Sequence, residues 1–465
     1  MSLMTSTVKP CPWAEVPERM RAEVERTFQE TRAPLSGQLL RASVVLERVQ
    51  PLDWLDGVSG ELRFYGSSRD QDQPLEVGGL GIADEAIWHE PVDYSVVIRR
   101  LSDTLNRSAD GLRYYGGFRF AGDAGPDTDW APFGVSRFVV PRFELRTAPA
   151  GSLLSFHFSA EEMASGVVEQ MLDRLDEMTF HSPEWRDTFP PPRARTDAPD
   201  RAGWLRNVTA ALDDFESGAL EKIVLARKAV FDFDGRLDPI TLMHRLKSST
   251  PECFHFCYMP TSDLAFVGAS PERLYRREGR GVETEAIAGT RMRGPDPVED
   301  DRLGLELLES EKDQREHAFV TEGIQRALEP LCDNITWEHT PALLKLARGQ
   351  HLYTPVTGAL REGRDDADIL AALHPTPAVG GSPTATALAR ISELEPFDRG
   401  WYAGPVGWVS RDAAEFAVAI RSGLVQPQRL SLFSGAGIVR GSTPDSEWEE
   451  IELKIRDFIK VLTGT

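Results

Sequence analysis

Two pairs of acidic residues occur in helical patterns far apart in the chain: Asp313 with Glu316, and Glu447 with Glu450. Residues at i and i+3 share one helix face, and Asp313 and Glu316 continue the apolar line that includes Val320. Because charges on a buried line need a partner, two such helices facing each other predict a Mg²⁺ site, which takes few protein carboxylates. The alternative is that these acids are solvated or form salt bridges with Lys312, Arg315 and Lys454.

A glycine-containing stretch precedes the second acidic pair. In residues 431–454 (SLFSGAGIVRGSTPDSEWEEIELK), a short strand precedes Gly435, Ala436 and Gly437, and a helix start signal follows at residues 442–444. Glycines let the backbone approach a ligand and present bare N–H groups to an anion. We therefore expect a glycine turn that holds an anion, followed by a helix on which Lys454 shares the face of the two glutamates.

Lys222 is a candidate general base. In EKIVLAR it shares a strand face with Val224 and Ala226, which are small and apolar. For base chemistry its pKa would have to fall from about 10.4 towards 7–8, and burial can supply such a shift. The alternative is a solvated or salt-bridged lysine.

Glu272 is a candidate general acid, and Arg421 a candidate anion receptor. In GASPERLYRR, strand alternation puts Glu272 on the face opposite Arg273, so the arginine need not neutralise it. A carboxyl group in a dry site can stay protonated near pH 7 and donate a proton; the alternative is a structural role. Arg421, in AVAIRSG, is expected on a strand that points at the glycine turn, where a guanidinium can grip a carboxylate at two points.

Several common motifs are missing. The glycine stretch lacks the third glycine of a dinucleotide fingerprint, since position 440 is Arg, and the chain has neither a GxxxxGK[ST] loop nor a GxSxG elbow. These absences disfavour NAD, ATP and serine-hydrolase functions. Cys253, His255 and Cys257 alternate like zinc ligands, but no second ligand pair accompanies them, so we expect core packing.

The composition restricts the partners. The 465 residues include 52 Lys plus Arg against 73 Asp plus Glu, a formal charge of −21, which disfavours a nucleic-acid or anionic-membrane partner. Four cysteines fit a reducing compartment. Since neither a membrane-length apolar run nor a signal sequence is present, we expect a cytoplasmic protein.

The chain divides into two halves at a Pro-rich stretch, residues 182–199. Residues 1–200 combine a helix at 14–30, short alternating runs typical of an antiparallel sheet, and a helix at about 160–178. Residues 201–465 contain the chemical motifs and a long helix expected at about 300–330. Because strands come in neighbouring runs, we predict an α/β or α+β fold with largely antiparallel sheets.

The second half, from about 204 to 462, resembles the chorismate-utilising enzymes. These are isochorismate synthase, salicylate synthase and the synthase subunits that make anthranilate and aminodeoxychorismate. The resemblance rests on ordered motifs, namely EKIVLAR, SPERL, TEAIAGT, SEKDQREH, QHLYTPVTG, LHPTPAVGGSP, EPFDRGWYAGPVGW, AIRSG and GAGIVRGSTPDSEWEEIELK. RYYGGFRF and RFVVPRFEL in the first half are similar to isochorismate synthases of menaquinone synthesis.

The resemblance implies one large fold of stacked antiparallel sheets and outer helices, with the site between them. It implies Mg²⁺ on Glu316 and Glu450, with Asp313 and Glu447 holding the metal's waters, and the ring carboxylate of chorismate on the metal. The implied groups around the rest of the substrate are Arg421, Tyr402, Lys454 and the backbone of Gly435, Ala436 and Gly437 for the enolpyruvyl carboxylate. Thr290 and His351 are expected to line the pocket, and the alternative for His351 is a place behind the lining residues.

The resemblance also assigns the reaction. Lys222 would deprotonate water for attack at C2, and Glu272 would protonate the departing C4 hydroxyl. Relatives that install nitrogen, and salicylate synthases, tend to carry Thr where this chain has Ala378, whereas isochorismate synthases have Ala. We therefore predict a Mg²⁺-dependent isochorismate synthase for menaquinone or, next, siderophore synthesis, acting as a monomer or weak dimer. The rivals are salicylate synthase, an aminating subunit and a non-catalytic binding relative.

Overall fold

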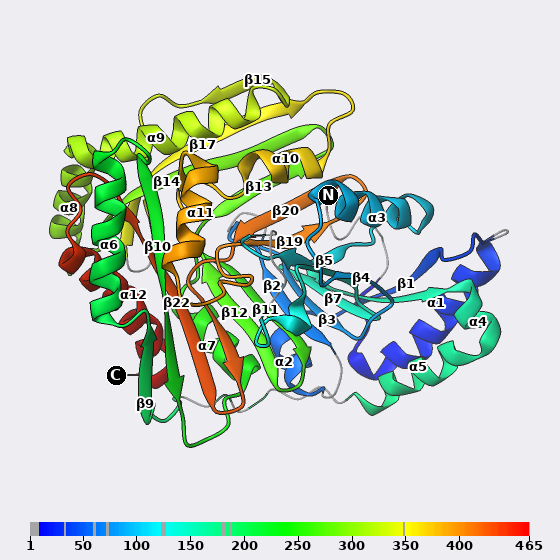
Figure 1. Cartoon of the computed structure of the whole chain (residues 1–465). Coiled ribbons are helices and arrows are strands. Elements are labelled where there is room, and N and C mark those ends of the chain that lie inside the picture. Colours follow the sequence, from blue (N-terminus) through cyan, green and yellow to red (C-terminus); the bar gives the residue numbers. More distant parts are fainter. Residues whose placement is uncertain are drawn as a thin grey trace.

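Two large antiparallel sheets, covered by helices, form the molecule (Figure 1). The computed structural model describes residues 9–31, 34–58, 62–70, 74–121, 127–178, 183, 185, 188–346 and 349–464. The predicted class, an α/β fold with stacked and mainly antiparallel sheets, is confirmed. Parts of the predicted Pro-rich connection lie outside the described residues.

The larger sheet has 12 strands. In spatial order they are β1 (Leu39–Leu46), β8 (Gly151–Ser159), β7 (Phe143–Ala148), β3 (Glu76–Leu80), β2 (Arg63–Ser67), β11 (Phe254–Thr261), β12 (Leu264–Ser270), β21 (Ser422–Gln426), β22 (Arg429–Ile438), β10 (Lys222–Asp232) and β18 (Gly381–Ser382), with β9 (Ala194–Ala198) also beside β10.

The smaller sheet has 10 strands. In spatial order they are β15 (Cys332–Trp337), β17 (Gly349–Leu360), β14 (Gly281–Met292), β13 (Arg273–Glu278), β20 (Ala413–Val418), β19 (Pro405–Val409), β5 (Tyr114–Phe118), β6 (Ser136–Val140) and β4 (Asp84–Trp88), with β16 (Ala342–Lys345) beside β17.

Both sheets contain strands from the first 200 residues and from the rest of the chain. In the larger sheet β2 pairs with β11, and in the smaller sheet β5 pairs with β19. The glycines in YYGGF allow the second pairing, since a Cβ atom at Gly117 would lie 2.7 Å from the carbonyl oxygen of Pro405 on β19. The division at about residue 200 therefore stays a prediction from the sequence. In both sheets, backbone hydrogen bonds join strands that come before and after that residue.

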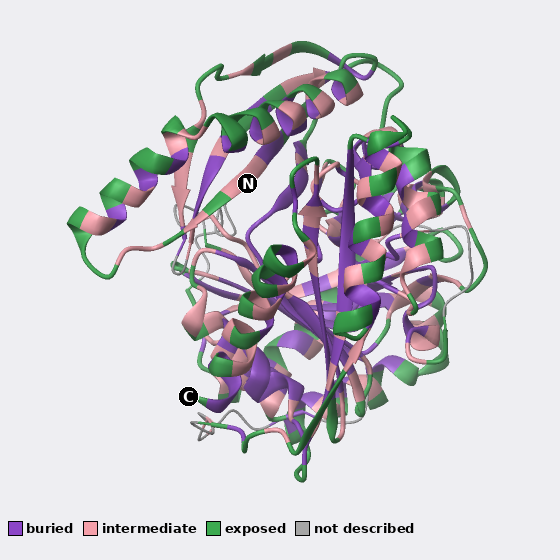
Figure 2. Cartoon of the chain, turned by 60° about the vertical axis from the view of Figure 1, so that its left-hand side comes forward, coloured by how far each residue is buried: buried purple, intermediate pink, exposed green. Residues whose placement is uncertain are grey.

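The helices surround the sheets, with outward faces exposed and strands buried beneath them (Figure 2). They are α1 (Val16–Glu30), α2 (Pro51–Asp56), α3 (Tyr94–Arg107), α4 (Ala160–Ser165), α5 (Val167–Glu177), α6 (Arg201–Glu216), α7 (Pro239–Ser249), α8 (Pro297–Glu309), α9 (Glu311–Leu328), α10 (Asp366–Leu373), α11 (Thr384–Leu394) and α12 (Pro444–Thr463), with short 3-10 turns η1 (Trp13–Glu15) and η2 (Ala131–Phe133). Among the described residues, no helix has the length and apolarity needed to cross a membrane.

Two expected helices are each divided in two. The predicted long helix at 300–330 was wrong, because Ser310 has an extended backbone between α8 and α9, and its hydroxyl accepts a hydrogen bond from the N–H of Asp313 at 3.3 Å. Such a cap starts a new helix. The expected helix at 160–178 is likewise divided at Gly166, whose φ of 76° lies in the left-handed region.

Two helices carry the predicted acidic pairs to the sheets. Helix α9 packs against β14 and β17, and α12 packs against β22. Thr443 caps α12 by accepting a hydrogen bond from the N–H of Ser446, with Pro444 in the first turn, as the sequence signal predicted. The helices thus approach neighbouring parts of the two sheets near the glycine segment of β22.

Candidate active site

The glycine segment is part of a strand. Gly435, Ala436 and Gly437 lie within β22, and Gly435 and Gly437 stand opposite Ala226 and Val224 of β10. The predicted glycine turn was therefore wrong, because pairing with β10 keeps the segment extended. Since β21 pairs with β22 only as far as Phe433, and backbone groups alternate along a strand, we infer that the N–H groups of Gly435 and Gly437 point away from β10.

The two glycines leave room for functional side chains. A Cβ atom at Gly437 would lie 3.1 Å from Cε of Lys222 and 3.8 Å from Oε1 of Glu316. At Gly435 it would lie 3.1 Å from the hydroxyl oxygen of Tyr402. The missing side chains thus allow a lysine, a carboxylate and a phenol to gather over one short piece of strand.

This close approach leads to a first prediction. In Gly437→Ala, the added methyl group should displace the end of Lys222 and lower kcat about tenfold, since small displacements of reacting groups are costly. Gly235→Ala is the control, because nothing lies within 4 Å of a Cβ atom there, and it should keep its kcat. Steady-state turnover of both variants makes the comparison; an unchanged kcat in Gly437→Ala would show that the approach is not critical.

Lys222 is buried at the start of β10 beside a carboxylate. Its side chain is 6% exposed, and Nζ donates a hydrogen bond to Oε1 of Glu316 at 3.1 Å. Glu316 comes from α9, 94 residues further along the chain. The fold therefore joins a predicted base to a predicted metal ligand.

Glu272 is buried immediately before β13. Burial is the main cause that raises the pKa of Glu272, to about 8, and the charge of Glu285 adds to it, while Lys222 and Arg69 act in the opposite direction. Because Lys222 acts electrostatically on Glu272, the two predicted groups lie in one region. A carboxyl group with this pKa is protonated at neutral pH and can donate a proton.

Arg273 does not neutralise Glu272. Its guanidinium pairs with Asp70 at 2.9 Å and with Glu415 at 3.0 Å. The arginine is therefore engaged by other carboxylates.

A cavity of about 270 Å³ begins at Pro271, next to Glu272, but Lys222, Glu272 and Glu316 are not among the residues that line it. Predicted residues line it, namely Thr290, His351, Arg421, Glu450 and Lys454, together with Pro271 next to Glu272. Much of the remaining lining is apolar, and the acidic residues Glu252 and Asp457 also contribute; the apolar side chains include Leu246, Met292, Leu346, Leu453, Phe458 and Val461. A hydrogen bond of 3.0 Å joins Thr290 Oγ1 to His351 Nδ1, and burial lowers the pKa of His351 to about 4, with Arg421 adding to the effect. His351 is therefore neutral near pH 7.

Arg421 occupies a strained junction. It lies between β20 and β21 with a φ of 52°, so the expectation that it sits on a strand was wrong. A positive φ in a residue other than glycine is costly and is found where surrounding structure enforces it, often at functional sites. Here the junction directs the chain from one sheet to the other and sets Arg421 at the cavity wall.

Lys454 and Tyr402 adjoin the same segment of β22. Nζ of Lys454 donates to the carbonyl oxygen of Gly435 at 3.0 Å and to Oε1 of Glu450 at 2.7 Å. The ring of Tyr402 is stacked on that of Phe433, with centroids 5.3 Å apart, and burial raises the pKa of Tyr402 to about 12. Tyr402 is therefore a hydrogen-bond donor at neutral pH.

The predicted metal ligands come from two helices, Asp313 and Glu316 from α9 and Glu447 and Glu450 from α12. Burial raises the pKa of Glu450, but the charges of Lys454, Arg421 and Lys312 outweigh it and lower the pKa overall. Burial also raises the pKa of Glu447, and the nearby charge of Glu450 adds to that. A bound cation would reduce the repulsion between such neighbouring carboxylates.

The donor set fits Mg²⁺ in its chemistry. In the part of the chain that the structure describes, no group of three or more His, Cys, Asp or Glu converges closely enough to hold a metal ion. Mg²⁺ commonly takes only one or two protein carboxylates and completes its shell with water and ligand, which Glu316 and Glu450 can provide. Asp313 pairs instead with Arg291 at 2.9 Å.

Ala378 lies in a loop held against β10. The flanking carbonyl of Gly380 accepts a hydrogen bond from the N–H of Val224 at 2.8 Å, and that of Val379 accepts one from Arg399 at 3.0 Å. The loop therefore borders the Lys222 end of β10. Ala378 itself is half-buried and is not among the residues that line the 270 Å³ cavity.

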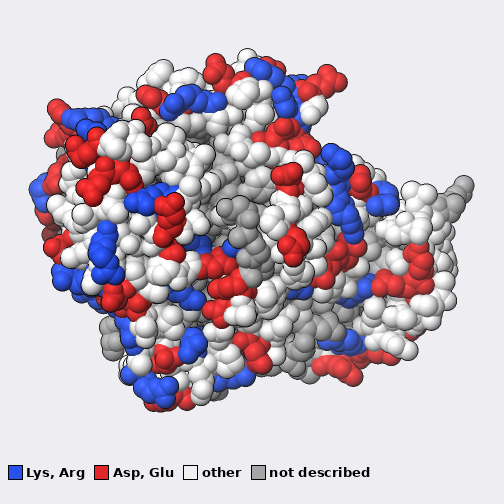
Figure 3. All heavy atoms as spheres, viewed as in Figure 1, with Lys and Arg blue, Asp and Glu red and all other residues white. Residues whose placement is uncertain are grey.

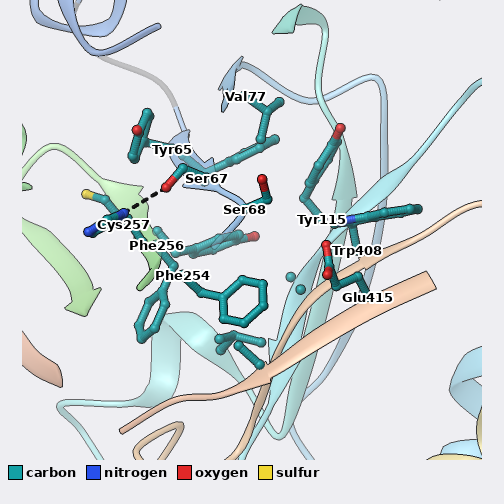
Figure 4. Close-up of a pocket in the computed structure, with 18 of the residues that line it drawn as sticks. Tyr65, Ser67, Ser68, Val77, Tyr115, Phe254, Phe256, Cys257, Trp408 and Glu415 are labelled. Atoms are coloured by element: carbon teal, nitrogen blue, oxygen red, sulfur yellow. Dashed lines mark hydrogen bonds between the residues drawn. The ribbon is translucent and has the colours of Figure 1, made fainter. Parts of the chain in front are cut away.

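Sequence reasoning missed a second cavity, of about 110 Å³, between the two sheets (Figure 4). Aromatic side chains dominate its wall, including Tyr65, Tyr115, Phe254, Phe256 and Trp408, and none of the predicted site residues lines it. The alternating aromatic residues of FHFCYM were the available signal. His255, in that run, is hydrogen-bonded to Ser67 at 2.8 Å, and Cys253, His255 and Cys257 are all buried, as core packing predicted.

Known proteins are similar to this chain in sequence and in fold. A sequence profile described as "Chorismate binding enzyme" matches residues 26–463. The isochorismate synthase MenF of Bacillus subtilis is 33% identical, over 97% of this chain and 98% of its own length. Isochorismate synthase 2 of Arabidopsis thaliana is 32% identical, over 92% of this chain and 81% of its own.

A solved structure agrees over almost the whole chain. It is that of MenF, the menaquinone-specific isochorismate synthase from Escherichia coli, with a TM-score of 0.85 and 26% sequence identity, covering 97% of this chain and all of that one. The profile match, the relatives and this structure extend over both halves of the chain. The chain belongs to the family of chorismate binding enzymes.

Proposed function

We propose that this protein is an isochorismate synthase, which converts chorismate to isochorismate with Mg²⁺. The observation that carries the proposal is the placement of a buried amine and a protonated carboxyl group, Lys222 and Glu272, within electrostatic reach of each other. A cavity that begins at Pro271, next to Glu272, has a lining that includes the cations Arg421 and Lys454. The names of the relatives support the same activity.

The reaction needs one proton removed and one proton supplied. Lys222 accepts a proton from water, whose oxygen attacks C2 of the ring. Glu272 gives its proton to the C4 hydroxyl, which leaves as water while the ring double bonds shift. Positioned acids and bases of this kind each contribute about 10²–10⁴-fold to rate.

The dianionic substrate is held by groups around β22. Arg421, Lys454 and the hydroxyl of Tyr402 receive the enolpyruvyl carboxylate, with the N–H groups of Gly435 and Gly437 beside them. Thr290 and neutral His351 line the wall near the ring. Glu316 and Glu450 would hold Mg²⁺, with Glu447 and Asp313 in supporting positions, and the ion would supply positive charge for the ring carboxylate.

Removal of the metal gives a second prediction. A chelator such as EDTA should abolish turnover, and Mg²⁺ should restore it. Mg²⁺ should also raise the free energy of unfolding, by about 2.7 kcal/mol at a hundredfold excess over its Kd. The Glu450→Gln variant should lose both effects; full activity in chelator would contradict the metal assignment.

The activity is tested by product identity. The protein is incubated with chorismate and Mg²⁺, with and without ammonium, and isochorismate, salicylate and anthranilate are distinguished by their spectra. Isochorismate alone is the expected product, in keeping with Ala378. Salicylate or anthranilate would assign the chain to another branch of the family, and a folded protein that binds chorismate without turnover would identify a binding relative.

We further propose menaquinone supply as the pathway and the cytoplasm as the compartment. The MenF relatives support the pathway, and a bacterial strain lacking its menaquinone-specific synthase should regain menaquinone on expressing this chain. Four free, buried cysteines fit a reducing compartment. On the face seen in Figure 3, acidic and basic side chains are interspersed, which with the net charge of −21 favours small-molecule chemistry without nucleic acid or membrane. A monomer or weak dimer is expected by light scattering.

A further inference from the structure

An arginine from the first half of the chain reaches the backbone that carries Glu272. Arg69 follows β2, and its guanidinium donates to Oε1 and Oε2 of Glu285 at 2.8 and 2.6 Å. It also donates to the carbonyl oxygen of Pro271. The Arg69 and Glu285 side chains are 11% and 1% exposed, so this is a buried, two-point ion pair.

Glu285 is hydrogen-bonded to the peptide group that follows Glu272. It lies on β14, and its Oε1 accepts a hydrogen bond from the N–H of Arg273 at 2.7 Å. The Arg69–Glu285 pair therefore contacts the peptide groups on both sides of Glu272. The N–H of Glu272 itself donates to Ser270 Oγ at 3.2 Å, which completes the restraint of this short segment.

The charges of Arg69 and Glu285 also affect the pKa of Glu272. The charged groups that act on Glu272 come from three elements: Glu285 on β14, Lys222 on β10 and Arg69 after β2. Glu285 raises the pKa of Glu272, whereas Lys222 and Arg69 lower it. Since like charge disfavours ionisation, loss of the Glu285 charge alone should make Glu272 a stronger acid.

We propose that Arg69 and Glu285 are positioning residues through which the first half of the chain aligns the general acid Glu272 and sets the charge around it. This rests on the proposed function, in which Glu272 donates a proton to the departing hydroxyl. Neither residue needs to touch the substrate. Removal of one partner of a buried ion pair costs stability, so the contacts with residues 271 and 273 have to be tested against a control that loses a comparable pair elsewhere.

The test compares two variants by their pH profiles. Glu285→Gln keeps the shape and removes the charge. Since Glu272 must be protonated to act, activity falls as pH rises through its pKa, and this alkaline limb of kcat/KM should move to lower pH by about one unit. Arg69→Lys keeps the charge but loses the two-point grip, so kcat should fall about tenfold, with the limb and KM unchanged.

Asp366→Asn is the matched control. Asp366 pairs with Arg277 on the same sheet at 2.7 Å, with side chains 5% and 10% exposed, so it should lose comparable stability without any shift of the limb. An unshifted limb in folded Glu285→Gln, or wild-type kcat in Arg69→Lys, would overturn the proposal. If Glu285→Gln does not fold, the result for Arg69→Lys still decides.

Failure of this inference differs from failure of the proposed function. If the wild-type protein makes no isochorismate, the function itself is wrong. If the wild-type protein is active and the two variants behave like Asp366→Asn, the function stands and the positioning role falls.

Discussion

Replacement of Lys222 by alanine should abolish isochorismate formation while chorismate still binds. The amine is the group proposed to take the proton from water, and loss of a general base costs about 10²–10⁴-fold in kcat. The carboxylate-binding groups, Arg421 and Lys454, remain in Lys222→Ala. Turnover followed by absorbance and binding followed by calorimetry measure the two effects separately.

Lys228→Ala is the matched control for this experiment. Lys228 lies on the same strand, and its Nζ pairs with Asp129 at 3.0 Å, so the variant loses a comparable ion pair away from the cavity. It should keep its turnover. Normal activity in Lys222→Ala would remove the base assignment.

Glu272→Gln should also be inactive, because the amide keeps the shape of the side chain but has no acidic proton to give. In the wild-type enzyme the same group predicts an alkaline limit: with a pKa raised by burial to about 8, Glu272 is protonated below that pH, and activity declines above it. Glu283→Gln makes the same change at an exposed position of β14 and should be fully active. Full turnover in Glu272→Gln would reject Glu272 as the acid.

The free energy of unfolding should also depend on the protonation of Glu272. The folded-state pKa of Glu272 lies above the unfolded value of about 4.3, so its contribution to stability is fully present below that pH. It is lost by about 1.4 kcal/mol per pH unit as pH rises towards 8. Glu272→Gln removes this loss, so at pH 8 the variant should resist urea better than the wild type. An equal or lower midpoint in the variant would contradict the raised pKa.

Sequence reasoning predicted the elements best where a local pattern is sufficient. The strand that begins at Lys222 has a run rich in β-branched and apolar residues, the helix that begins behind Thr443 has a capping signal, and both exist. The break at Ser310 had a signal too, a serine three residues before Asp313, but apolar periodicity that continued on either side concealed it. The glycine segment had a turn-like composition, and only its pairing with β10 shows that it is extended.

The parts that could not be predicted depend on distant contacts. Arg69 meets Glu285 across 216 residues, and neither residue stands in a motif that points to the other. The positive φ of Arg421 follows from the passage of the chain between the two sheets. No glycine or asparagine at that position indicates it in the sequence. The candidate residues could be named from the sequence and the resemblance, and so could the local pair of Lys454 with Glu450, but partners from distant parts of the chain could not.

The interleaved strand order affects how the protein can be synthesised. As the chain leaves the ribosome, β2 and β5 emerge with free edges, because their partners β11 and β19 begin only at Phe254 and Pro405. Exposed strand edges invite pairing with other chains. These edges of the nascent protein therefore stay open to pairing with other chains for a long interval, and neither sheet can be completed until translation is almost finished.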